Sequence, residues 1–221
     1  MIATFPSIKF GLMVGIGGGI PPKVRLGDVV VSTPTDHSPG VVQWGLGKAE
    51  DGGKFVRTGA LNNPPSALLT ALTLLKTEHE MHGPKISQYL DDLQKNWPRL
   101  VPQFTRSESL GHVLFRPDYS HVNKSSTDDG PIPKDEDRDD GEDDEKSCRF
   151  CDRTKIVERR PRDMLVHYCM IASGNQAIKD AAFQDQLNKK LGGNVLCVEM
   201  EAAGLMNDFP YIAGAGGRSD A

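Results

Sequence analysis

The stretch "SIKFGLMVGIGGGIPPKVRLGDVVVS", residues 7–32, places two apolar runs on either side of a glycine cluster and two adjacent prolines. Apolar runs rich in β-branched residues and bounded by Gly and Pro are typical of buried strands. We therefore expect two strands here, joined by a glycine turn at Gly15 to Gly19. The backbone amides of such a turn can approach an anion closely. A tight turn without a ligand explains the same residues equally well.

Two nucleotide-binding motifs are excluded at these glycines. The dinucleotide fingerprint needs G-x-G-x-x-G between a strand and a helix. Gly15 and Gly17 supply the first two glycines, but Ile20 occupies the third position and a second strand follows where the helix should be. A phosphate loop is excluded because Gly-Lys-Ser/Thr is missing.

Downstream of this stretch, helical and strand patterns alternate. Leucines recur at spacings of three and four behind Pro65 and Ser66, which predicts a helix. The further expected elements, in chain order, are a helix over 85–96, a strand over 164–175, a helix over 176–193 that stops at Gly192, and a strand, turn and helix over 194–210. This alternation predicts an α/β layered fold.

Composition limits the classes of partner. The 221 residues are 38% hydrophobic and 25% charged, with a formal net charge of −4. A chain of this kind forms one domain, or a domain with an insertion, and has no basic face for nucleic acid. The apolar stretch over 8–20 is rich in glycine and lacks a cleavage site, so neither a signal peptide nor a membrane span is expected. We expect a cytoplasmic protein.

A change of composition marks an insertion. Apolar residues almost vanish over 120–162, and nine of the eleven residues from Asp135 to Glu145 are acidic. Such a run cannot bury apolar surface and predicts a solvated loop. The expected organisation is a first domain part over 1–119, the insertion, and a second part over 163–221. Cys148 and Cys151 form one C-x-x-C, half of a zinc site, but we favour reduced thiols and expect no metal.

Two carboxylates follow the apolar run "NVLCV" in "VEMEAAG", residues 198–204. Burying a charge without a partner is costly, so Glu199 and Glu201 need one. A carboxylate at this position can accept two hydrogen bonds from a cis-diol, such as the 2′ and 3′ hydroxyls of a ribose. Alternatively the pair caps the start of a helix, where the helix dipole favours Glu.

"GIGGGIPPKVRLGDVVVS", "IASGN" and "VEMEAAG", in this order, resemble the purine nucleoside and uridine phosphorylase family, which includes methylthioadenosine/adenosylhomocysteine nucleosidase. The sequence of these motifs and the long insertion are most similar to nucleoside phosphorylase-like domains of fungal NLR-type receptors. The resemblance implies a three-layer αβα sandwich around a mixed sheet, and cleavage of the N-glycosidic bond of a purine nucleoside by water or phosphate. It implies no cofactor beyond phosphate as co-substrate, and it implies a homo-oligomer.

The resemblance also assigns roles by position. Gly15 to Gly19 would border the phosphate or water site, Met200 would pack against the sugar, and Glu201 would accept its hydroxyls. The candidate substrate-binding residues are therefore Gly15, Gly17, Gly18, Ser173, Gly174, Asn175, Glu199, Met200 and Glu201.

Several departures from the family pattern bear on activity. Met13 and Ile16 stand where phosphorylases of the family hold phosphate with an arginine and a serine, and Ala177 stands where nucleosidases stack an aromatic ring. The family's general acid falls near Ser219, which leaves Asp220 as the catalytic candidate. The segment before it, "YIAGAGG", lacks the apolar residues expected of a central strand.

The family's N-terminal strands precede Met1, so the chain is expected to be clipped at both ends. Two functions follow as hypotheses. The first is N-glycosidic cleavage, with hydrolysis favoured over phosphorolysis, and the second is a non-catalytic module that binds a nucleoside or another protein.

Overall fold

A computed structural model describes residues 7–35, 38–50, 54–105, 113–120, 122, 150–178, 180–207 and 211–218. The chain divides into two compact units. The first is formed by Met1–His112 and Pro161–Asp220, and the second by Val113–Arg160. The acidic run over 135–145 lies outside the described residues.

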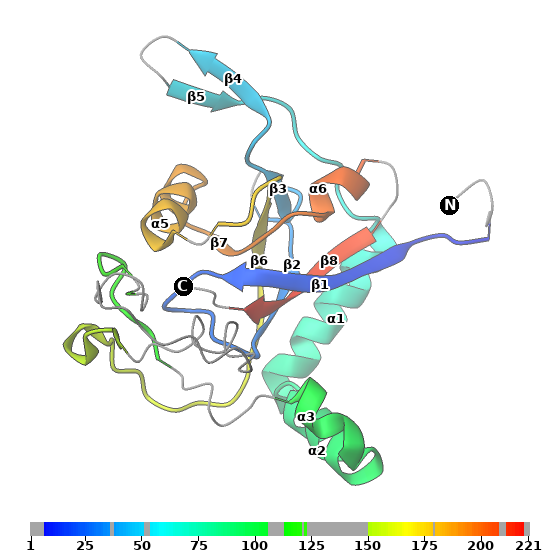
Figure 1. The fold of residues 1–221 in the computed structure, drawn as a ribbon. Helices are drawn as coiled ribbons and strands as arrows, with labels where there is room; N and C mark the ends of the chain where they lie inside the picture. Colours follow the sequence, from blue (N-terminus) through cyan, green and yellow to red (C-terminus); the bar gives the residue numbers. More distant parts are fainter. Residues whose placement is uncertain are drawn as a thin grey trace, which may run out of the picture. The chain divides into compact units, whose positions relative to one another are not determined.

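Strands of the first unit close into a ring. The pairings run β2–β8–β1–β7–β6 and return from β6 to β2, which pairs with Val166–Cys169 on the edge of β6 opposite β7 (Figure 1). β3 pairs with Ile171–Ser173 further along that same edge. Parallel and antiparallel pairs both occur, so the sheet is mixed, as predicted. The strands are β1 (Gly11–Gly19), β2 (Val29–Ser32), β3 (Val41–Gln43), β6 (Val166–Ser173), β7 (Val195–Glu199) and β8 (Tyr211–Arg218).

The predicted glycine turn is wrong, because Gly15 to Gly19 continue strand β1. None of these glycines has a positive φ. Close packing explains at least one of them: a Cβ on Gly17 would collide with the Cys197 sulfur and lie 3.1 Å from the Ala215 Cβ. Gly17 therefore lets β1, β7 and β8 approach one another within the ring.

The expectation that "YIAGAGG" cannot form a central strand is also wrong. β8 lies between β1 and β2, parallel to the first and antiparallel to the second. Its inward residues Tyr211, Ala213 and Ala215 are buried in the ring. Small residues suffice here because the interior is filled by larger side chains from other strands, including Val30 and Ile171.

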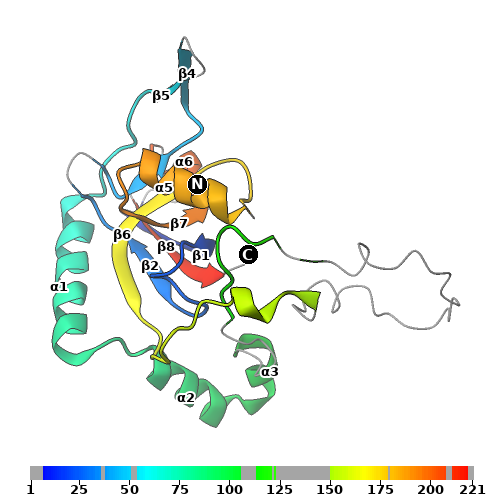
Figure 2. The same ribbon diagram turned by 90° about the vertical axis from the view of Figure 1, so that its left-hand side faces the viewer.

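Two helices cover different parts of the sheet (Figure 2). Leu68 and Leu72 of α1 (Ser66–His82) pack on Ile212 of β8, with Val31 and Tyr168 beside them. Leu187 of α5 (Ala181–Lys190) packs on side chains of β3, β6 and β7, which belong to the same buried cluster. The predicted helix over 176–193 is confirmed over this shorter range, since Asp180 caps its N-terminus through a hydrogen bond from the Phe183 amide.

The remaining described elements are short or peripheral. Helix α2 (Ile86–Asn96) confirms the prediction over 85–96, and α6 (Ala202–Leu205) follows β7 as predicted. Further elements are the hairpin β4 (Gly47–Glu50) and β5 (Lys54–Arg57), the turn η1 (Pro98–Leu100), α3 (Val101–Phe104) and, in the second unit, η4 (Arg153–Lys155). No helix in the described part of the chain is long and apolar enough to span a membrane.

Candidate functional site

The carboxyl ends of three parallel strands meet at one edge of the sheet. Ser173 at the end of β6 pairs in register with Glu199 at the end of β7 and with Gln43 at the end of β3. The Gly174 amide donates to the Glu199 carbonyl at 3.0 Å, and the Trp44 amide donates to the Ser173 carbonyl at 3.0 Å. The predicted segments "IASGN" and "VEMEAAG" are therefore adjacent, although 24 positions separate Gly174 from Val198.

Glu199 is buried and caps helix α6. One carboxylate oxygen, Oε2, accepts hydrogen bonds from the amides of Glu201 and Ala202, both at 2.8 Å. The capping role considered from sequence is thus the role that Glu199 has. Its other oxygen, Oε1, is buried without a hydrogen-bond partner in the described residues. A buried acceptor of this kind needs a donor, which a bound hydroxyl group or a water molecule supplies.

Met200 and Glu201 are exposed immediately beyond this buried pair. Among the described residues, the Glu201 carboxylate accepts one hydrogen bond, from the Met200 amide to Oε2 at 3.1 Å. An ionised carboxylate has about four acceptor positions, so most of those of Glu201 are available to a ligand. Half of the Met200 surface is exposed beside it and offers an apolar contact.

The "IASGN" segment is held by Ser173, which was selected from sequence, and by Trp44, which sequence reasoning missed. The Ser173 hydroxyl accepts a hydrogen bond from the Ala203 amide at 3.0 Å, which joins the ends of β6 and β7 a second time. Gly174 must be glycine because a Cβ there would collide with the Trp44 indole. The sequence cue that could have selected Trp44 is its position directly after the short apolar run "GVVQ", at the end of a strand. Its indole nitrogen is buried without a partner in the described residues.

Asn175 lies exposed just after this contact, and a Cβ on Gly45 would be 3.9 Å from its amide oxygen. The Trp44 ring also meets Phe183 of α5 edge to face, with ring centres 5.8 Å apart. An aromatic side chain therefore does flank the "IASGN" segment, although Ala177 itself carries none.

The glycine run reaches this edge from the ring. Gly18 pairs in register with Val198, and Gly17 packs against the Val198 carbonyl, so this part of β1 lies beside the end of β7. Met13 points into the ring, whereas the Ile16 side chain is 69% exposed on the opposite face. Met13 and Ile16 therefore cannot line the same phosphate site, because residues an odd number of positions apart face opposite sides of a strand. Asp220 lies outside the described residues.

The interior beside Glu199 disfavours additional charge. Burial, together with the charges of Glu199 and Cys169, raises the pKa of the Cys197 thiol to about 12. Burial and the charge of Glu199 likewise raise the pKa of Tyr211, whose hydroxyl donates to the Ala202 carbonyl. These groups are neutral at pH 7 and serve packing and hydrogen bonding rather than nucleophilic chemistry.

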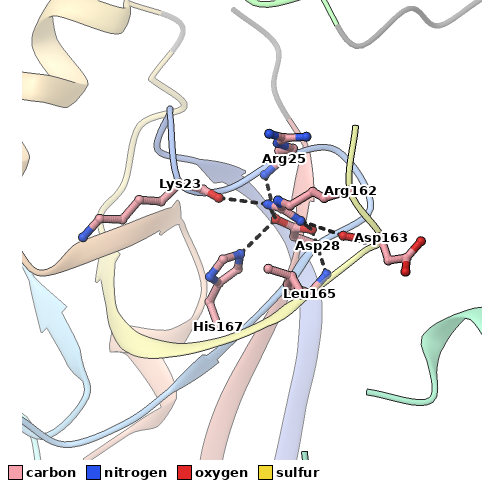
Figure 3. Close-up of polar contacts among 7 residues, drawn as sticks. All are labelled: Lys23, Arg25, Asp28, Arg162, Asp163, Leu165 and His167. Carbon is pink, nitrogen blue, oxygen red and sulfur yellow. Dashed lines mark hydrogen bonds and ion pairs between the residues drawn. The ribbon is translucent and has the colours of Figure 1, made fainter. Parts of the chain in front are cut away.

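A second buried carboxylate, Asp28, is fully satisfied by comparison (Figure 3). Arg162 donates to both of its oxygens, His167 lies 2.9 Å away, and the amides of Arg25 and Leu165 complete its shell at 2.9 Å. Burial opposes its ionisation, but the hydrogen bonds led by Arg162 outweigh burial and hold its pKa well below the usual aspartate range. Every donor comes from the protein, so Asp28 is a structural anchor.

The described residues contain no group of three or more His, Cys, Asp or Glu side chains placed to hold a metal ion. Cys151 is buried, and Cys148 lies outside the described part of the chain.

Comparisons with known proteins give one sequence relative. No protein-family model matches the chain. A nucleotide-binding leucine-rich repeat (NLR)-like protein of Hyaloscypha variabilis is 36% identical over 212 residues, which cover 95% of this chain and 19% of the relative. The chain thus spans about a fifth of the length of that relative. A futalosine hydrolase mutant of Helicobacter pylori, aligned over 100% of this chain and 61% of its own, is 11% identical with a TM-score of 0.45.

Proposed function

We propose that this chain is a nucleoside-binding domain whose reaction is cleavage of the N-glycosidic bond of purine nucleosides. The observation that carries the proposal is the junction of β6 and β7, where the Gly174 amide donates to the Glu199 carbonyl. Asn175 and Met200 each lie one residue beyond that hydrogen bond, and Glu201 follows. An exposed carboxylate, a thioether and a carboxamide are thereby gathered at one strand edge.

These groups suit the parts of a nucleoside. A ribose has an apolar face and two neighbouring hydroxyls, which Met200 and Glu201 match. The Glu201 carboxylate accepts two hydrogen bonds at once, and hydrogen bonds to a charged acceptor are about twice as strong as neutral ones. Glu199 contributes indirectly, because by capping α6 it fixes the backbone from which Glu201 projects.

A rigidly held ribose favours the oxocarbenium-like transition state of the reaction, because the entropy of orienting the sugar is lost on binding and no longer adds to the barrier for breaking the bond. Hydrolysis transfers the ribose to water and releases the free base, whereas phosphorolysis forms ribose 1-phosphate and the same base. The exposed position of Ile16 supplies no phosphate ligand, which favours water. Protonation of the leaving purine is assigned to Asp220 as a proposal from the resemblance.

Glu201 provides the test of binding. Calorimetric titration with adenosine, inosine and methylthioadenosine measures affinity, and 2′,3′-dideoxyadenosine serves as the ligand without the diol. We expect Glu201→Gln to weaken adenosine at least tenfold, as the loss of about 1.5–3 kcal/mol of charged hydrogen bonding requires. The same substitution should leave dideoxyadenosine unchanged. Glu80→Gln, at an exposed glutamate of α1, is the matched control.

Turnover is measured separately by chromatography of released base, with and without phosphate, on the full polypeptide. Base released without phosphate supports hydrolysis, and base released only with phosphate supports phosphorolysis. No saturable heat with any nucleoside would contradict the nucleoside site altogether.

Binding without turnover is the second candidate function. The observation that favours it is the NLR-like relative, of which this chain matches only a fifth. A module within such a long polypeptide would use the same site to sense a nucleoside. Saturable heat that depends on Glu201, together with no released base, would select this function over catalysis.

A further inference from the structure

Trp44, the residue that directly follows β3, carries a buried hydrogen-bond donor without a partner. Its backbone amide is satisfied, because it donates to the Ser173 carbonyl at 3.0 Å. The indole Nε1, in contrast, is buried and has no hydrogen-bond partner in the described residues. Buried tryptophan N–H groups normally find an acceptor, since an unpaired one costs its full desolvation free energy. The Trp44 N–H group therefore requires an acceptor that the described residues do not supply.

Contact with Gly174 places this unpaired donor at the candidate site. Chain neighbours apart, Nε1 is the atom nearest to the place that a Cβ on Gly174 would take. The edge of the indole that carries the N–H group thus borders Gly174, which precedes Asn175. The Gly174 amide in turn donates to the Glu199 carbonyl at 3.0 Å. The donor therefore belongs to the same junction of strand ends as the exposed groups of the site.

The order of the strands sets Trp44 and Glu201 on two sides of Asn175. Strand β6 lies between β3 and β7, so Trp44 flanks the end of β6 on one side, and Met200 and Glu201 follow β7 on the other. Neighbouring strands are about 4.8 Å apart, so the ends of β3 and β7 are separated by roughly 10 Å. A nucleoside spans a distance of this order from its ribose hydroxyls to the far edge of its base. A ligand whose ribose is held by Glu201 therefore brings its base toward Trp44.

We propose that Trp44 recognises the purine base, with its indole N–H donating a hydrogen bond to an acceptor on the edge of the base. This role rests on the proposed nucleoside site and adds the residue that distinguishes a base from other groups attached to a ribose. A purine suits the position, because its flat ring is apolar on both faces and carries ring nitrogens with free lone pairs on its edge. Phe183 of α5 supports the indole edge to face, with ring centres 5.8 Å apart.

Calorimetric titration of Trp44→Phe with adenosine and 2′,3′-dideoxyadenosine tests this role. The substitution keeps an aromatic ring beside Gly174 but removes the N–H donor. We expect it to weaken both ligands about fivefold or more, the loss of one hydrogen bond, because both ligands carry the base. Glu201→Gln, in contrast, should weaken only the ligand with the diol. Trp97→Phe is the matched control, because Trp97 just after α2 is 58% exposed, and it should leave both affinities unchanged.

Circular dichroism of each variant shows whether it is folded. Unchanged affinity of folded Trp44→Phe for both ligands would overturn the role of Trp44, while the nucleoside site would stand.

Tryptophan fluorescence keeps the test decisive if Trp44→Phe fails to fold. The chain has two tryptophans, so in Trp97→Phe all tryptophan emission comes from Trp44. Adenosine should quench or shift this emission with the dissociation constant that calorimetry gives. Saturable heat from adenosine with constant Trp44 emission would overturn the contact with the base and leave the ribose contacts in place. No heat from any nucleoside would instead contradict the nucleoside site itself, and the role of Trp44 with it.

Discussion

Two carboxylates of the first unit, Asp28 and Glu199, illustrate how the same chemical group serves different ends at the scale of the residue. Both are buried, with 0% and 3% of their surface exposed. Asp28 receives donors on both oxygens from the protein alone, so it stabilises the fold. Glu199 uses one oxygen as a cap, and its other oxygen, at the candidate site, has no partner in the described part of the chain. Sequence reasoning selected Glu199 and passed over Asp28, since a single Asp within "RLGDVVVS" gives no sign of its distant partner Arg162.

Substitution of Asp28 should be costly. Asp28→Asn removes the buried negative charge between Arg162 and His167 and leaves the half-buried Arg162 guanidinium without its carboxylate. Breaking a fully buried pair costs about 3–5 kcal/mol in the free energy of unfolding, so we expect a loss toward the lower end, about 3 kcal/mol. Urea denaturation followed by circular dichroism measures the change. Asp118→Asn is the control, because Arg116 also contacts both carboxylate oxygens of Asp118, but in an exposed position. An equal loss in both variants would contradict the role of burial.

The same carboxylate predicts a dependence of stability on pH. The native pKa of Asp28 lies below its value in the unfolded chain, so its stabilisation is fully present above about pH 4. The stabilisation is lost as the pH falls through the lower native pKa. Urea midpoints of the parent chain and Asp28→Asn should therefore differ by a constant amount between pH 7 and pH 5, and converge below pH 4. A difference that already shrinks between pH 7 and pH 5 would show that another group dominates.

At the scale of the element, the prediction of strands and helices succeeded where local patterns were strong. Repeated leucines identified α1, and apolar β-branched runs identified β2, β6 and β7. The failures were both glycine-rich: the supposed turn is part of β1, and the supposedly unsuitable "YIAGAGG" is β8. Glycine lowers strand propensity when judged alone, but at Gly17 the close approach of Cys197 leaves no room for a Cβ. Such packing is decided by residues far away in the chain.

Glycine packing gives a test of this explanation. Gly17→Ala should destabilise the fold by about 1–3 kcal/mol, because the added methyl group collides with the Cys197 sulfur and crowds Ala215. Gly15→Ala, on the same strand, is the control, since its added Cβ meets only the Met13 methyl carbon at 3.9 Å. Thermal unfolding of both variants measures the difference, and equal stability of the two would refute close packing at Gly17.

At the scale of the whole molecule, the ring of strands predicts that two thiols are protected from reagents while the chain is folded. Cys169 of β6 and Cys197 of β7 lie in the ring, and burial raises the pKa of each to about 12. A disulfide reagent at pH 8 should therefore modify neither thiol while the chain is folded, and both once it is unfolded in urea. Mass spectrometry of proteolytic peptides identifies the modified cysteines. Rapid modification of Cys197 under native conditions would show that β7 opens without unfolding of the ring.

The sequence by itself determined the alternation of strands and helices, because hydrophobic periodicity is a local property. It also determined the chemical character of the candidate site, since Glu201, Met200 and Asn175 could be selected from short motifs. Only the tertiary structure decided that β1 and β8 are neighbours, that Trp44 holds Gly174, and that Glu199 caps while Glu201 remains free. The first two outcomes depend on contacts between residues distant in the chain, where the space left by one element decides which side chain its neighbour can carry. The third depends on the turn after β7, which aims the backbone amides of Glu201 and Ala202 at the Glu199 carboxylate.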